Sequence, residues 1–89
     1  MHIEFDAAKD KENIHKHGIS LARAVDLSDA IVVPDERFKE RRFRVYGLID
    51  HAWHCAAITL RGEAVRVISL RRAHLKEVRR HDRREARTD

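Results

Sequence analysis

The stretch AWHCAAITLRGEAVRVISL, residues 52–70, decides the fold. Residues 52–60 and 65–70 are almost continuously apolar, as expected of strands buried in the middle of a sheet. The intervening Arg61-Gly62-Glu63 has the composition of a tight turn centred on its glycine. The stretch therefore predicts a β-hairpin whose two strands are central to the sheet.

Upstream of this hairpin the pattern predicts two more strands. In residues 43–49, apolar side chains alternate with Arg44 and Tyr46, which is the period of two of a half-buried strand. Residues 31–33 form a shorter apolar run that stops at Pro34. Both strands precede the hairpin in the chain and are expected to extend its sheet.

The N-terminal residues predict a short strand followed by a helix. Residues 2–5 alternate in polarity as a first strand does. A helix over residues 7–17 is expected between Asp6, which has the chemistry of an N-cap, and Gly18, whose freedom to adopt positive φ suits the end of a helix.

Two further helices complete the chain. A short one begins after the N-cap residue Ser20 and ends near Asp29, and one face of it carries Leu21, Ala24 and Val25. Residues 73–84 form helix-prone, basic sequence, and residues 86–89 are expected to fray. The fold class is therefore α+β.

The expected architecture is an antiparallel sheet with two N-terminal helices on one face and a basic C-terminal helix, in the order β-α-α-β-β-β-α. Residues 1–85 form a single domain, because 89 residues support only one core. Part of the sheet surface then stays free for a ligand.

Composition excludes several classes of protein. The sequence has no apolar run of the roughly 20 residues that span a bilayer and no signal-peptide layout, so a cytoplasmic protein without membrane contact is expected. The lone Cys55 lies among apolar neighbours and is expected in the core. The histidines have poor ligand spacing, so we expect no metal and no other cofactor.

Positive charge is concentrated in the C-terminal half. The net charge is −4 over residues 1–36, +3 over 37–60 and +5 over 61–89. Most of the cationic side chains are arginine, whose planar guanidinium suits bidentate contacts with phosphate. An anionic polymer is the natural partner, although surface arginines also serve to solubilise a small domain.

Five residues on or beside the last hairpin could hold a phosphate: Arg61, Arg66, Ser69, Arg71 and Arg72. Strand alternation puts Arg66 on the face opposite Val65 and Val67, toward solvent or a bound anion. Guanidinium groups and a hydroxyl on one surface could stabilise the charge of a five-coordinate phosphorus. The alternative is that Arg66 pairs with a carboxylate.

The first helix carries a second candidate group. Lys9, Asn13 and His17 are spaced by four residues and form one polar stripe. His17 could act as a general acid or base if the helix end faces the arginines, or it could simply stabilise the helix C-terminus. Spacing alone leaves both roles open.

Two motifs at opposite ends of the chain resemble the BrnT family. The first reads Phe5-Asp6-Ala7-Ala8-Lys9, then Asn13, then Lys16-His17-Gly18-Ile19-Ser20. The second reads Arg61-Gly62, then Arg66-Val67-Ile68-Ser69-Leu70-Arg71-Arg72-Ala73, then Lys76-Glu77. The order is that of the family, and only residues 35–55 match loosely. The family often has Trp in place of Phe5 and Tyr near His81, which puts the role of the last helix in question.

The resemblance implies a RelE-like fold and a ribonuclease toxin of a type II toxin–antitoxin system, which halts translation. Its implied partners are RNA, a BrnA-like antitoxin, and promoter DNA through the antitoxin complex. The implied catalytic residues are Lys16, His17, Arg61, Arg66, Ser69 and Arg71. For RNA binding we single out Lys9, Arg72, Lys76, Arg79 and Arg80.

The expected reaction is metal-independent attack of a ribose 2′-hydroxyl on the adjacent phosphorus, since the sequence offers many charge stabilisers and few acid–base groups. Two alternatives use the same arginines: a non-catalytic nucleic-acid-binding module, and a basic partner of an acidic protein.

Overall fold

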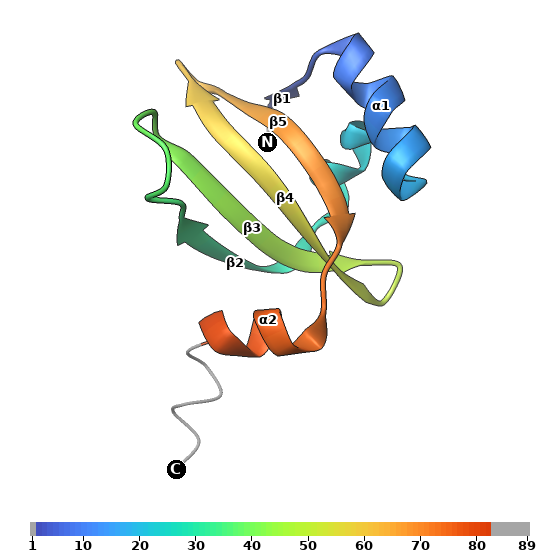
Figure 1. Ribbon diagram of the computed structural model, residues 1–89, viewed down its shortest axis with the longest axis vertical. Helices are drawn as coiled ribbons and strands as arrows, with labels where there is room; N and C mark the ends of the chain where they lie inside the picture. The colour runs from blue at the N-terminus through green and yellow to red at the C-terminus, as the bar shows by residue number, and fades with distance from the viewer. Residues whose placement is uncertain (1, 83–89) are drawn as a thin grey trace.

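A computed structural model describes residues 2–82 as a single sheet with helices on both of its faces (Figure 1). The elements are β1 (Ile3–Glu4), α1 (Ala7–His17), the 3-10 helix η1 (Leu21–Asp26), β2 (Ser28–Pro34), β3 (Arg42–Ile49), β4 (Ala52–Arg61), β5 (Ala64–Arg72) and α2 (Leu75–His81). The strand order is β1-β5-β4-β3-β2, so the predicted hairpin is central as expected. No helix within the described residues is long and apolar enough to cross a bilayer.

The sheet differs from the prediction in two respects. It is mixed rather than antiparallel, because β1 pairs with β5 in parallel, Ile3 beside Val65. It has five strands, as the five strand segments identified in the sequence indicate, whereas the expected element order contained only four. The run around Ile31 is longer than predicted and forms the full strand β2 along β3. Parallel pairing of β1 follows from topology, since α1 and η1 separate it from the rest of the sheet.

Helix α1 has the predicted bounds and caps. The Asp6 carboxylate accepts hydrogen bonds from the backbone N–H of Ala8 at 2.8 Å and of Lys9 at 3.1 Å. Gly18 ends the helix with φ 71°, a conformation that costs glycine little. The helix therefore begins and ends for the local reasons visible in its sequence.

The Asn13 side chain fastens α1 to the edge of β5. Its Nδ2 donates to the carbonyls of Leu70 at 2.7 Å and Ile19 at 3.0 Å, and its Oδ1 accepts from the Leu70 N–H at 3.1 Å. The backbone pairing of β1 with β5 reaches only Val65 and Arg66, so Asn13 satisfies strand groups that β1 does not.

The helices that follow depart from the expected form. The second is a 3-10 helix that ends at Asp26, and Leu21 and Ala24 are buried beneath it, whereas Val25 is exposed. The last helix, α2, is shorter than predicted, and residues 83–89, which include the expected fraying tail, lie outside the described residues.

The two faces of the sheet bury separate cores. On one face, which we call the η1 face, Leu21 and Ala24 pack with Ala56, Val67 and Leu70. On the other, the α2 face, Val78 of α2 packs with the fully buried Tyr46 and with Cys55, which is a core residue as predicted. Figure 1 shows η1 behind the sheet and α2 in front of its lower end, so most of the α2 face has no helix over it.

A β-bulge in β5 decides which side chains share the α2 face. Ala57 pairs with Ser69 and Ile58 with Val67, so Ile68 has no partner on β4. In a regular strand, residues 66 and 69 point to opposite faces. The extra residue shifts the alternation, and Arg66, Ser69 and Arg71 come to lie on one face.

Candidate active site

Three rows of cross-strand neighbours cross the α2 face from β3 through β4 to β5. The row under α2 is Tyr46, Cys55 and Arg71; the middle row is Arg44, Ala57 and Ser69; the outer row is Arg42, Thr59 and Arg66. Arginines therefore stand on both sides of Thr59 in the outer row, and Arg44 stands beside Ala57 in the middle row. This arrangement makes a shallow surface with cationic walls.

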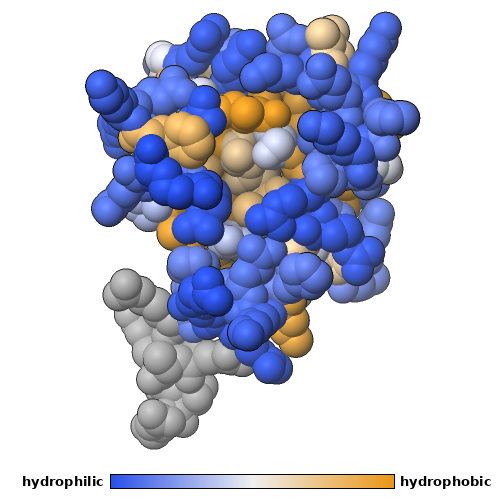
Figure 2. Space-filling view, in the orientation of Figure 1, coloured by the Kyte–Doolittle hydropathy of each residue, from blue (hydrophilic) through white to orange (hydrophobic). Residues whose placement is uncertain are grey.

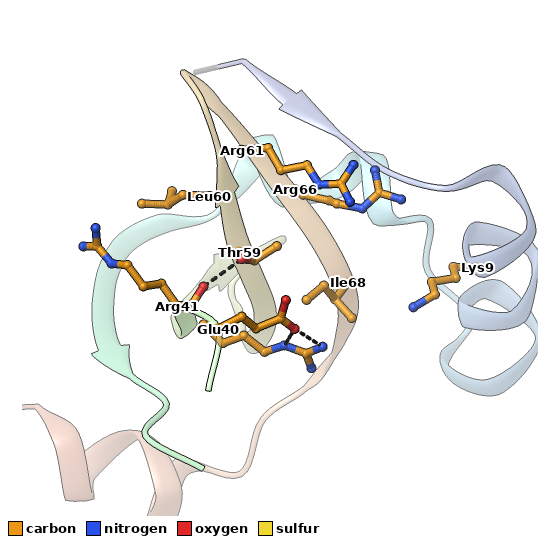
Figure 3. A pocket seen from close by; sticks show the side chains of 9 residues that line it. Lys9, Glu40, Arg41, Thr59, Leu60, Arg61, Arg66 and Ile68 are labelled. Carbon is orange, nitrogen blue, oxygen red and sulfur yellow. Dashed lines mark hydrogen bonds and ion pairs between the residues drawn. The ribbon is translucent and has the colours of Figure 1, made fainter. Parts of the chain in front are cut away.

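The outer row opens into a hollow of about 550 Å³, which we call the basin. Its lining comes from α1, the β2–β3 connection and strands β3 to β5: Lys9, Glu40, Arg41, Arg42, Thr59, Leu60, Arg61, Arg66 and Ile68. Figure 2 shows this face hollowed, with a hydrophobic to neutral floor inside a hydrophilic rim. In Figure 3 Arg61 and Arg66 lie together at one edge, with Lys9 reaching in from α1.

The guanidinium of Arg66 is weakly engaged. Its Nη1 lies 3.6 Å from Oε1 of Glu4, and the two side chains keep 27% and 38% exposure. An exposed ion pair of this length contributes little, so an incoming phosphate could displace Glu4 at small cost. The sequence allowed two roles for Arg66, contact with an anion and pairing with a carboxylate. In the structure its side chain faces the basin and also has the Glu4 carboxylate beside it, so the geometry is compatible with both roles.

Arg44 has an unused donor. Its Nη1 donates to the Tyr46 hydroxyl at 3.2 Å, while its Nε is buried and has no hydrogen-bond partner within the described residues. A buried unpaired donor on a charged group is costly, and this Nε could reach an anion above the middle row only if the side chain moved.

Arg42 is held at the margin of the basin. It pairs with Glu40 at 2.6 Å, and its guanidinium carbon lies 4.1 Å from the centroid of the Phe38 ring. The Glu40 side chain is more than half exposed, so this pair also faces solvent.

Arg71 differs from the other arginines because it fastens α2 to the sheet. Its Nη1 lies 2.8 Å from Glu77 Oε1, and the same carboxylate accepts the His74 N–H at 3.0 Å where α2 begins. The Arg71 hydrogen bond, more than the other contacts, lowers the pKa of Glu77 to about 2. The guanidinium is thus committed to a structural contact.

His81 lies near the middle row, at the end of α2. Its ring stacks on Tyr46, with centroids 5.6 Å apart and an interplanar angle of 18°. Burial, then the positive charges of Arg44 and Arg80, lower the pKa of His81, so its neutral form is favoured near pH 7. Burial raises the pKa of Tyr46, which keeps its proton.

The predicted site residues fall into three groups. Arg66 and Ser69 lie on the open part of the α2 face, with Arg61 and Lys9 at the rim of the basin. Lys76, Arg79 and Arg80 are exposed on α2. Lys16, His17 and Arg72 do not line the basin.

His17 lies eight residues beyond Lys9, about 12 Å farther along α1, since a helix rises about 1.5 Å per residue. Arg72 follows Arg71 in a regular part of β5, and its side chain therefore belongs to the η1 face. We accordingly leave both residues out of the site.

Sequence reasoning missed Arg42, Arg44 and the position of His81. Both arginines occupy polar positions of an alternating strand, which did signal exposure on one face. Placing them opposite Thr59 and Ala57 requires the pairing register of β3 with β4, and no local pattern gives that register.

Fold and site together define a small α+β domain with an open, arginine-bearing sheet face that is the candidate site for an anion. The chain belongs to the BrnT family, because the sequence model of that family, described as the ribonuclease toxin BrnT of type II toxin–antitoxin systems, matches residues 5–77. It is also similar to the crystal structure of the Brucella abortus ribonuclease toxin BrnT, with a TM-score of 0.70 and 29% identity over 83% of this chain and 97% of that chain. No curated protein sequence matches it.

Proposed function

We propose that this chain is an endoribonuclease toxin that cuts RNA on its α2 face by metal-independent transesterification. The observation that carries the proposal is the placement of arginines on both sides of β4, with Arg42 and Arg44 on β3 and Arg66, which has only a weak partner, on β5. Membership in the ribonuclease toxin family supports RNA as the substrate.

In this reaction the ribose 2′-hydroxyl attacks the adjacent phosphorus and its proton passes to a base. The bond to the 5′-oxygen breaks and that oxygen takes up a proton, leaving a cyclic phosphate and a 5′-hydroxyl. Negative charge grows on the non-bridging oxygens of the five-coordinate phosphorus. Arg44 on β3 and Arg66 on β5 lie on opposite sides of β4 and can donate to these oxygens, and Ser69 adds a hydroxyl.

For the proton transfer we propose His81 as the base. It stacks on Tyr46 of the row under α2 and is close enough to Arg44 of the middle row for that charge to lower its pKa, which keeps it unprotonated near neutral pH. In this family position a tyrosine is common, and a histidine there has the more suitable pKa for accepting a proton at pH 7. His17 is farther along α1 and has no part in the proposal.

Flanking phosphates of the RNA would contact the rim. Lys9 and Arg61 extend the basin toward α1 and the β4–β5 turn, while Arg79 and Arg80 are exposed on α2. These contacts position the strand without reading its bases, so they should act uniformly across sequences.

In the cell we propose that the chain is cytoplasmic, inhibits translation by cutting RNA, and is neutralised by a BrnA-like antitoxin. Promoter DNA would be bound through the antitoxin complex. These proposals rest on membership in a type II toxin family.

The test is cleavage of a single-stranded RNA oligonucleotide by the purified chain in the presence of a chelator. Arg44→Met and Arg66→Ala are each expected to lower the cleavage rate by about 100-fold or more, as loss of one preorganised donor does. Arg72→Ala, which removes an exposed arginine of the other face, is the matched control and should leave the rate within about twofold.

Replacing the attacking 2′-hydroxyl by hydrogen at the cleaved position should abolish the reaction. Cleavage of that DNA-like substrate would contradict the mechanism. RNA binding without cleavage by the wild-type chain would instead support a non-catalytic binding module.

A further inference from the structure

The η1 face carries an apolar surface that no described element covers. Helices α1 and η1 pack chiefly against β5, at one end of the sheet. Toward the other end, Val32 lies opposite Val45 on this face, and Ile58 lies on β4 two residues beyond Ala56, the partner of Val45. Val32 is 58% exposed and Leu60 46% exposed. An apolar sheet face of this kind is normally buried against another element.

Next to η1 this surface deepens into a hollow of about 190 Å³, which we call the apolar groove. Its wall is almost entirely hydrocarbon and includes Ile3, Leu27, Val32, Val45, Ile58 and Val65. It lies on the face opposite the basin, so an occupant of the groove need not compete directly with RNA.

Outside the described residues, Met1 and Ala86 are the two apolar side chains of the given sequence, too few to cover the surface from Val32 to Ile58. A second copy of this chain is also a poor occupant. A symmetric contact would bring a hollow to a hollow and leave a void. It would also bring together two copies of residues 1–36, which supply half of the groove lining and carry a net charge of −4.

We propose that the apolar groove receives an amphipathic helix of the antitoxin, with an apolar stripe in the hollow and basic side chains toward residues 1–36. The proposal rests on the proposed function, because it takes the partner to be that of a type II toxin. A convex stripe of large apolar side chains fits the hollow, and basic flanks match the acidic segment. The helix anchors the antitoxin on the η1 face.

The test measures the affinity of the purified chain for its cognate BrnA-like antitoxin, by calorimetry. Val32→Glu puts a charge at the groove and should weaken binding by about 100-fold. Val32→Thr, which keeps the branched shape suited to a strand, should weaken it several-fold and serves if the charged variant fails to fold. Leu75→Glu changes an apolar residue of similar exposure, 49%, on α2 and should bind like the wild type.

RNA cleavage and thermal unfolding are measured on the same preparations. Wild-type cleavage by Val32→Glu, combined with loss of inhibition by the antitoxin, supports the proposal. The proposal would be overturned if both Val32 variants bound the antitoxin within twofold of the wild-type affinity, or if the wild type did not bind it at all. It would also be overturned if the chain formed a dimer that Val32→Glu dissociates. Absence of cleavage by the wild type would defeat the proposed function and leave the affinity comparison valid.

Discussion

Replacing Asn13 by Ala should destabilise the fold well beyond what a helix substitution normally does. The change removes three hydrogen bonds and leaves the backbone N–H and C=O of the buried Leu70 without their side-chain partner. At about 1 kcal/mol or more for each lost bond, the cost is about 3–4 kcal/mol, offset by roughly 0.6 kcal/mol of better helix propensity. We expect a net loss of about 3 kcal/mol and a melting temperature lower by about 12–24 °C.

The assay is urea unfolding followed by circular dichroism, with Glu12→Ala as the matched control. Glu12 is the exposed neighbour of Asn13 on α1, and its substitution should change the unfolding free energy by less than about 0.5 kcal/mol. Asn13→Asp keeps an acceptor for the Leu70 N–H but turns a carboxylate toward two carbonyls, so it should cost at least as much as Asn13→Ala. An Asn13→Ala variant as stable as the control would refute the reasoning.

Three further predictions concern the ion pair that links α2 to the sheet, the close approach of Gly47 to Leu27, and the proposed base His81. The pKa of Glu77 is lowered to about 2, so its pairing with Arg71 stabilises the fold fully above about pH 4.5, and this contribution falls as the pH drops toward 2. Glu77→Gln should therefore lower the free energy of unfolding in urea by about 1–2 kcal/mol at pH 7. A difference between wild type and variant that stays the same at about pH 2.5 would contradict this role of Glu77. Gly47→Ala should cost about 1–3 kcal/mol, because the new Cβ would lie 2.9 Å from Leu27 Cβ. A smaller cost in a Leu27→Gly background, which removes that Cβ, is the check. His81→Ala should lower RNA cleavage at pH 7 by about 100-fold or more and remove the acid limb of the pH–rate profile, whereas an unchanged profile would exclude His81 as the base.

Local sequence signals predicted the elements whose boundaries depend on neighbouring residues. Asp6 and Gly18 specified both ends of α1, and the turn at Gly62 specified the central hairpin, in which that glycine has φ 57°. The mixed sheet was missed because the pairing of β1 with β5 joins residues about 60 positions apart, and no local pattern encodes such a pairing.

The candidate site was predicted in part, for a related reason. Arg66 was identified by its place among apolar neighbours, and Ser69 and Arg71 by the family motif. Arg44 was overlooked because only the register of β3 with β4 shows which residues lie beside it. Arg71 was predicted to contact phosphate because its pairing with Glu77 depends on how α2 packs on the sheet, which the local sequence does not show.

The bulge at Ile68 makes strand pairing, as well as composition, a determinant of this surface. Arg66 and Ser69, three positions apart, belong to one face only because β5 contains one more residue than its partner strand at that point. Deletion of Ile68 would place them two positions apart in a regular strand, so both would stay on one face. Insertion of one residue opposite it in β4 would give Ile68 a partner, restore the regular alternation and turn Arg66 and Ser69 to opposite faces. Alignments of this segment are therefore informative only when the gap is placed correctly.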